Sequence, residues 1–101
     1  MTVSREPIIE ISAAGNSTKA EIYRNLQILY STQAGEQALD RDFGIDVSIM
    51  DVPTEGAKAL LTAEYVRKTE MYEPRAKVQR VEWLSGKEEQ NLIPKVVVQL
   101  V

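Results

Sequence analysis

One short run of residues in this chain could do chemistry, the sequence Glu73-Pro74-Arg75, in which opposite charges flank a rigid ring. A glutamate can transfer protons, and an arginine can pair with a carboxylate through two parallel hydrogen bonds. A general acid needs a raised pKa, which usually comes from burial away from cations. Arg75 would instead lower the pKa of Glu73. The run is therefore interpreted either as a binding element or as a helix stop with a local ion pair.

The residue types that most often carry catalysis are absent. The chain contains no cysteine and no histidine, which excludes thiolate chemistry and zinc–sulfur sites and removes the commonest general base. A glycosidase needs only two suitably spaced carboxylates, but 15 acidic residues ensure that some pair lies close by chance. We expect no enzymatic activity, no cofactor, no metal site and no small-molecule substrate.

The tripeptide Asp42-Phe43-Gly44 matches the magnesium-binding motif of protein kinases. At 101 residues the chain is too short for a kinase, and it lacks the Gly-rich loop and the His-Arg-Asp loop. We interpret Phe43 as a core residue and Gly44 as a turn.

Composition limits both the fold and the partners. The chain has 12 basic and 15 acidic residues, for a net charge of −3, and no cluster of Lys and Arg, which argues against nucleic-acid and anionic-membrane partners. With 44% apolar and 27% charged residues it is typical of a folded protein, and residues 1–101 fit a single domain. No apolar run approaches membrane-spanning length and no signal-like segment begins the chain, so synthesis in a cytoplasm is expected.

The first half of the chain predicts a strand and a helix. Pro7 to Ile11 favours a short strand. Thr18 and Glu21 have the spacing of a capping box at a helix start. The apolar face of that helix recurs at helical spacing and ends near Ser31 or Thr32; its residues are Ile22, Leu26, Leu29 and Tyr30.

The middle of the chain predicts a short strand and a second helix. Alternating apolar residues at Ile45, Val47 and Ile49 suggest a small extended piece. The second helix begins at Pro53 or Thr54, and Pro74 forbids its continuation. Its apolar side is expected to consist of Ala59, Leu60, Ala63, Val66 and Arg67, widened by Ala57, Leu61 and Tyr65.

The last third predicts two strands. Ala76 and Val78 share one face, Val81 and Trp83 are out of phase with them, and a β-bulge near Gln79–Arg80 would return all four to the core. Ser85-Gly86 begins a polar hairpin loop. The fold class is therefore α+β, with two helices on a small antiparallel sheet in the order β-α-(short β)-α-β-β.

The terminal strand offers a second candidate binding element. Alternation would bury Val96, Val98 and Leu100 and leave Val97, Gln99 and Val101 on the opposite face, where two valines are unusual for a solvated surface. An open strand edge there would accept a strand from another chain. The alternative, left equally open, is that the segment around Ile8 covers Val97 and Val101.

Several short motifs are spread along most of the chain. They are Asn25-Leu26 with Ile28-Leu29, Thr32, Gly35-Glu36, Phe43-Gly44 with Asp46, and Tyr72-Glu73-Pro74-Arg75 followed by Ala76, Val78 and Val81. Together they resemble a known family, the baseplate wedge proteins of contractile phage tails, tailocins and type VI secretion systems, often labelled lysozyme-like. The resemblance covers about Lys19 to Leu100, and the Glu-Pro-Arg run is its most specific part.

The resemblance implies a structural subunit that initiates the tail sheath. Its partners would be other baseplate wedge proteins and the sheath protein, and its location the baseplate of a virion or tail-like particle assembled in the bacterial cytoplasm. Glu73, Pro74 and Arg75 would contact the wedge core, and the terminal strand would belong to the sheet that meets the sheath. The chain departs from many family members at Gln37-Ala38, where they carry Arg and a bulkier apolar residue.

Two other functions remain as alternatives. The family's fold also resembles a bacterial anti-adaptor that blocks delivery of a sigma factor to proteolysis, so a regulatory binding protein is one alternative. A peptidoglycan-cleaving lysozyme is the other. The three kinds of contractile particle are not distinguished by the sequence.

Overall fold

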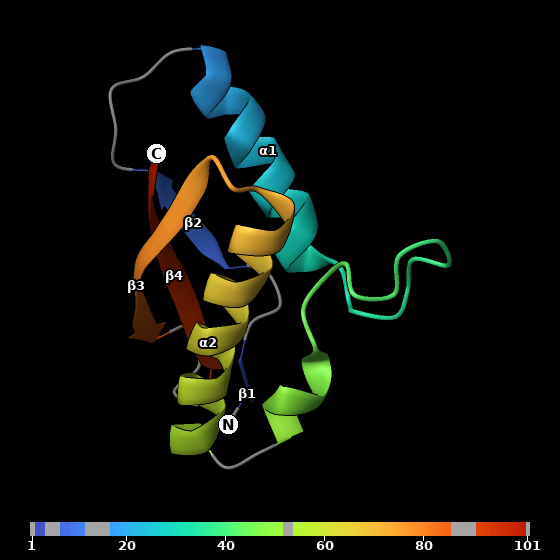
Figure 1. The fold of residues 1–101 in the computed structure, drawn as a ribbon. Coiled ribbons are helices and arrows are strands. Elements are labelled where there is room, and N and C mark those ends of the chain that lie inside the picture. The colour runs from blue at the N-terminus through green and yellow to red at the C-terminus, as the bar shows by residue number, and fades with distance from the viewer. Residues whose placement is uncertain (1, 4–6, 12–16, 52–53, 86–90, 101) are drawn as a thin grey trace.

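The structure, a computed structural model, describes residues 2–3, 7–11, 17–51, 54–85 and 91–100. Within these ranges the chain forms four strands, two α-helices and one 3-10 helix, whose arrangement is drawn in Figure 1. They are β1 (Thr2–Val3), β2 (Ile8–Ile11), α1 (Ser17–Ser31), η1 (Val47–Asp51), α2 (Thr54–Tyr72), β3 (Ala76–Ser85) and β4 (Asn91–Leu100).

The sheet is built around β4. β3 pairs with one side of β4 in antiparallel fashion, whereas β1 and β2 pair with it in parallel. The predicted α+β class, with two helices on a small sheet, is confirmed. The sheet is mixed, however, and not antiparallel as predicted. Parallel neighbours need a long crossover connection, and the helices that lie between β2 and β4 in the sequence provide it.

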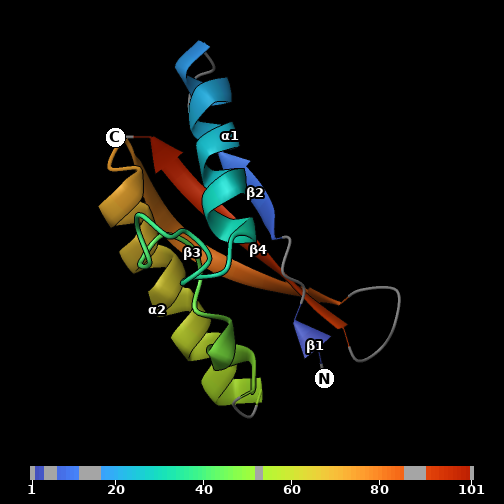
Figure 2. The same ribbon diagram turned by 90° about the vertical axis from the view of Figure 1, so that its right-hand side faces the viewer.

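Both helices pack against one face of the sheet (Figure 2). The predicted face of α1 is confirmed, since its four residues are all at least 97% buried. They join Ile9 of β2 and Val96 and Val98 of β4 in one hydrophobic cluster. The side chain of Thr18, the expected cap, lies outside the described residues. No helix in the described ranges is long and apolar enough to cross a membrane.

The predicted face of α2 is wrong in part: Ala57, Leu61 and Tyr65 are buried and Val66 packs against the core, as predicted, but the other members are not buried. Ala59, Leu60, Ala63 and Arg67 are exposed. The buried side consists of Ala57, Leu61, Glu64, Tyr65, Lys68 and Thr69. Half of these residues are polar, so hydrophobic periodicity alone points to a stripe rotated away from the true one.

The predicted bulge in β3 is confirmed. Val78 pairs with Val98, and the next pair joins Arg80 to Val97, so Gln79 is the extra residue. The shift places Val81 opposite Val96 on the core face. The expected hairpin loop that follows β3 lies outside the described residues.

The short strand expected between the helices is a 3-10 helix instead. Val47 and Ile49 lie in η1, and strand-like pairing is limited, in the described segment 33–51, to a bridge between Gln33 and Ile45. The bridge closes the base of a loop, residues 33–45, which projects from the body of the molecule (Figure 1). Phe43 packs against the hydrophobic cluster from this loop, as predicted.

Candidate functional site

The Glu73-Pro74-Arg75 run forms a compact ion pair where α2 ends and β3 begins. Arg75 donates two hydrogen bonds to the carboxylate, from Nε to Oε1 at 2.7 Å and from Nη2 to Oε2 at 3.0 Å. The Glu73 amide still donates to the Thr69 carbonyl at 2.9 Å, closing the last helical turn. The bidentate carboxylate partner of Arg75 is therefore supplied by its own chain.

Helix α1 completes this junction from the other end of the sequence. Asn25 Nδ2 donates to Glu73 Oε2 at 3.0 Å, and Arg75 Nη2 lies 3.4 Å from Glu21 Oε1. Asn25 and Glu73 are 48 positions apart. The cluster thus joins α1 to the start of β3 through charge-assisted hydrogen bonds.

The electrostatics of the junction oppose proton donation. The Arg75 hydrogen bond lowers the pKa of Glu73, and burial opposes that shift only in part. The same hydrogen bond raises the pKa of Arg75. Both groups are held in their charged forms, so Glu73 is suited to positioning Arg75 and not to general-acid chemistry.

The three residues differ in what they offer to another molecule. Glu73 is only 4% exposed, and its carboxylate is occupied within the chain. Pro74 is exposed, and 42% of the Arg75 side chain remains accessible. Glu73 therefore has the structural role expected of a helix stop with a local ion pair, whereas Pro74 and Arg75 are available to contact another protein.

The 33–45 loop packs beside this junction. The Phe43 and Tyr72 rings meet edge to face, with centroids 5.1 Å apart. Gly44 has φ of +107°, and a Cβ there would lie 2.5 Å from the Thr32 carbonyl oxygen. Only glycine permits this approach of loop and helix end.

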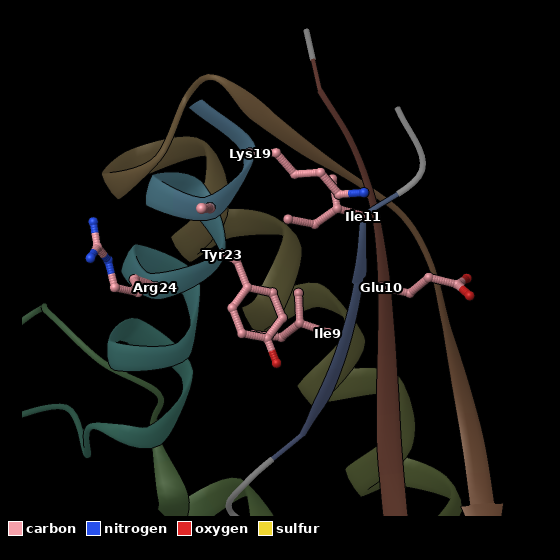
Figure 3. A pocket seen from close by; sticks show the side chains of 7 residues that line it. Ile9, Glu10, Ile11, Lys19, Tyr23 and Arg24 are labelled. Atoms are coloured by element: carbon pink, nitrogen blue, oxygen red, sulfur yellow. The ribbon is translucent and has the colours of Figure 1, made fainter. Parts of the chain in front are cut away.

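A groove of about 770 Å³ runs between α1 and β2 (Figure 3). Ile9 and Ile11 line it from the strand, and Tyr23 projects into it from the helix. Lys19 extends from the helix toward the strand, whereas Arg24 and Glu10, which also line the groove, point away from it. The groove is a concave, largely apolar surface with a strand edge along one wall.

The outer strands β2 and β3 differ as docking edges. Within the described residues, β2 and β3 each pair only with β4. The bulge at Gln79 interrupts the ladder of β3, a feature that blunts edges against pairing. β2 has no such interruption in its register with β4. The β2 edge is therefore the better platform for an added strand.

The expected open edge on the terminal strand is wrong. β4 is the central strand, so both of its sides are occupied. Val97 does face away from the helices, but it is 1% exposed and pairs with Glu10 of β2. Gln99 is exposed, and its Oε1 accepts a hydrogen bond from Gln79 Nε2 at 2.8 Å. Val101 lies outside the described residues.

Polar pairs explain why Val97 is buried on a face that the helices do not cover. Lys95 and Glu10 lie 3.5 Å apart, and Arg80 and Glu82 lie 3.0 Å apart. Glu10 of β2 and Arg80 of β3 pair with Val97, whereas Lys95 lies two residues before it on β4 and pairs with Glu82. Long polar side chains cover apolar surface with their stems.

Sequence reasoning missed the residues on α1 that complete the junction, and the groove. The sequence identifies Glu21 only as part of a helix cap and Asn25 only as part of a family motif, and it predicts no contact of either residue with Glu73 or Arg75. The groove depends on the parallel pairing of β2 with β4, which the sequence did not predict. Among the described residues, no group of three or more acidic side chains is placed to hold a metal ion.

Comparison with known proteins gives no identification. No protein-family model matches the chain, and no curated protein matches it.

Proposed function

We propose that this protein is a structural wedge subunit in the baseplate of a contractile tail-like particle, where it docks on other wedge proteins and initiates the sheath. It would assemble in the bacterial cytoplasm and remain in the particle. Pro74 and Arg75 are the proposed contacts with the wedge core. Glu73 contributes by fixing the Arg75 guanidinium.

One observation carries the proposal: motifs from three separate segments, the ones that resemble the wedge family, meet in space. Asn25 bonds to Glu73, and Phe43 packs on Tyr72. Gly44 approaches the Thr32 carbonyl. A chance set of short motifs need not converge on one junction, so their convergence supports the family resemblance.

The β2 edge is the proposed platform for the sheath. An added strand would form main-chain hydrogen bonds with Ile8–Ile11, and its inward side chains would enter the groove beneath α1. This replaces the terminal strand as the expected pairing element. The apolar walls, Ile9, Ile11 and Tyr23, favour an apolar side chain on the incoming strand.

A catalytic role is not proposed. The carboxylate most suggestive of one, Glu73, has a lowered pKa because Arg75 holds it, whereas a lysozyme needs one carboxylic acid with a raised pKa. A turbidity assay on permeabilised cells from acidic to neutral pH checks this. Clearing that a single Glu or Asp substitution abolishes would establish an enzyme instead.

Co-expression tests the structural role. The protein is produced with the products of neighbouring genes, and the complex is purified through a tag on this chain. The proposal predicts a stable complex with wedge subunits. A protein that purifies alone, beside wedge subunits that assemble without it, would refute the proposal.

A further inference from the structure

The 33–45 loop is closed at its base by backbone hydrogen bonds. Ala34 donates to the Ile45 carbonyl at 2.9 Å, and Ile45 donates to the Thr32 carbonyl at 2.8 Å. Farther out, Gly35 donates to the Arg41 carbonyl at 2.8 Å. These bonds make the loop a narrow projection that leaves the helical layer and returns to it (Figure 1).

Helix α2 holds this projection with polar side chains. Lys68, only 2% exposed, donates from Nζ to the Asp42 carbonyl. The Tyr72 hydroxyl donates to Asp40 Oδ1 at 2.9 Å. A buried ammonium group is costly unless it is hydrogen-bonded. The hydrogen bond from Lys68 therefore satisfies its buried ammonium group and fixes the loop backbone at Asp42.

The loop presents one large apolar side chain at its tip. Leu39 is 103% exposed, and residues 36–42 are all exposed. A single exposed leucine needs no explanation by itself. Here, however, the leucine stands on a projection whose backbone is fixed from α2, so it would lose little conformational freedom on binding. A backbone that is already held in place lowers the entropy cost of association.

The charges around the tip restrict its partner. The tip carries an excess of negative charge, because it contains three acidic residues, Glu36, Asp40 and Asp42, and one basic residue, Arg41. A basic rim around an apolar pocket would complement it. An anionic membrane would repel it, and one leucine buries too little surface for a membrane anchor.

We propose that Leu39 is the anchor of a second protein-docking surface, which inserts into an apolar pocket with a basic rim on a different protein. This surface is separate from Arg75 and from the groove beside β2. The inference does not require the partner to be a baseplate protein.

Photo-crosslinking identifies the partner directly. A benzophenone amino acid replaces Leu39 in one variant and Leu60, an exposed leucine of α2, in a matched control, in cells that naturally make the protein. Position 39 is expected to crosslink to one other protein, at a peptide with apolar residues beside Lys or Arg. Crosslinking to a second copy of this chain, to an acidic segment, or no more often than position 60 would overturn the inference.

Binding of the crosslinked protein is then measured with purified components. Leu39→Ser should weaken it about tenfold or more, because a buried leucine side chain is lost, and Leu60→Ser should leave it within about twofold. Both variants should melt like the wild type. Unchanged binding by Leu39→Ser would overturn the inference. Wedge and sheath assembly by the same variant tests the proposed function separately, because that function rests on Arg75 and the groove beside β2. Weakened binding with normal assembly would uphold this inference whatever the fate of the proposed function, and unchanged binding would overturn this inference alone.

Discussion

Asn25 and Glu73 are joined by a hydrogen bond of 3.0 Å between side chains that are 48 positions apart in the sequence. Glu73 is also the bidentate partner of Arg75, so one buried carboxylate connects α1, the end of α2 and the start of β3. Breaking this connection should affect the fold as well as any docking.

Reversing the charge of Arg75 should therefore destabilise the protein. Arg75→Glu removes the partner of a buried carboxylate and adds like charge beside it, so we expect the melting temperature to fall by about 5 °C or more. The matched control is Lys58→Glu, because Lys58 also pairs with a glutamate close by in the sequence, but that glutamate is 91% exposed. The control should change the melting temperature by no more than about 2 °C. Equal effects of the two changes would show that the Glu73 pair has no special role.

The junction should also make stability depend on acid pH. The pKa of Glu73 lies below its usual 4.5 when folded, chiefly because of Arg75. Its contribution is present above the unfolded pKa and is lost as pH falls through the lower folded value. Urea unfolding of wild type and Glu73→Gln, from about pH 6 to about pH 3, should give a steeper loss for the wild type. Parallel curves would contradict this.

The two glycines of the 33–45 loop should differ in their tolerance of alanine. Gly35 has φ of +98° and open space where a Cβ would lie, whereas a Cβ at Gly44 would come within 2.5 Å of the Thr32 carbonyl oxygen. Gly35→Ala should cost about 1–2 kcal/mol for the left-handed conformation alone. Gly44→Ala should cost more, because the backbones must also separate. Denaturant unfolding of both variants measures the difference, and equal losses would argue against a close approach at Gly44.

The outer face of the sheet should respond differently at two neighbouring positions. Val97→Asp buries a carboxylate opposite Glu10, and we expect a loss of about 2 kcal/mol or more. Gln99→Asp, at an exposed position, should stay within about 0.5 kcal/mol of the wild type. Thermal melts of both variants compare them. A stable Val97→Asp would mean that the polar pairs do not cover Val97.

Patterns carried by apolar residues could be predicted from the sequence. The face of α1 and the bulge in β3 follow from periodicity, because in both places the buried side chains are apolar. The polar half of the α2 face could not, since Glu64, Lys68 and Thr69 are buried through hydrogen bonds to Asp46, Asp42 and Tyr30. Such partners lie far away along the chain and leave no local signal.

The candidate site also contains one feature that the sequence could predict and others that it could not. The Glu73–Arg75 pair could be predicted because its members are two residues apart. Its partners on α1 could not, and neither could the central place of β4, which depends on how β2 returns to the sheet. The burial of Val97 follows from that placement and from the polar side chains of three strands.

Sheath growth on purified baseplates tests the central claim most directly. Ala20 is an exposed residue that lines the groove beside β2, so Ala20→Arg should block the groove and leave the core intact. Ala59→Arg, at an exposed position on α2, is the control. We predict that baseplates carrying Ala20→Arg contain the protein but grow no sheath in electron micrographs, while those with Ala59→Arg grow normal sheaths. Normal sheaths with Ala20→Arg would contradict the account.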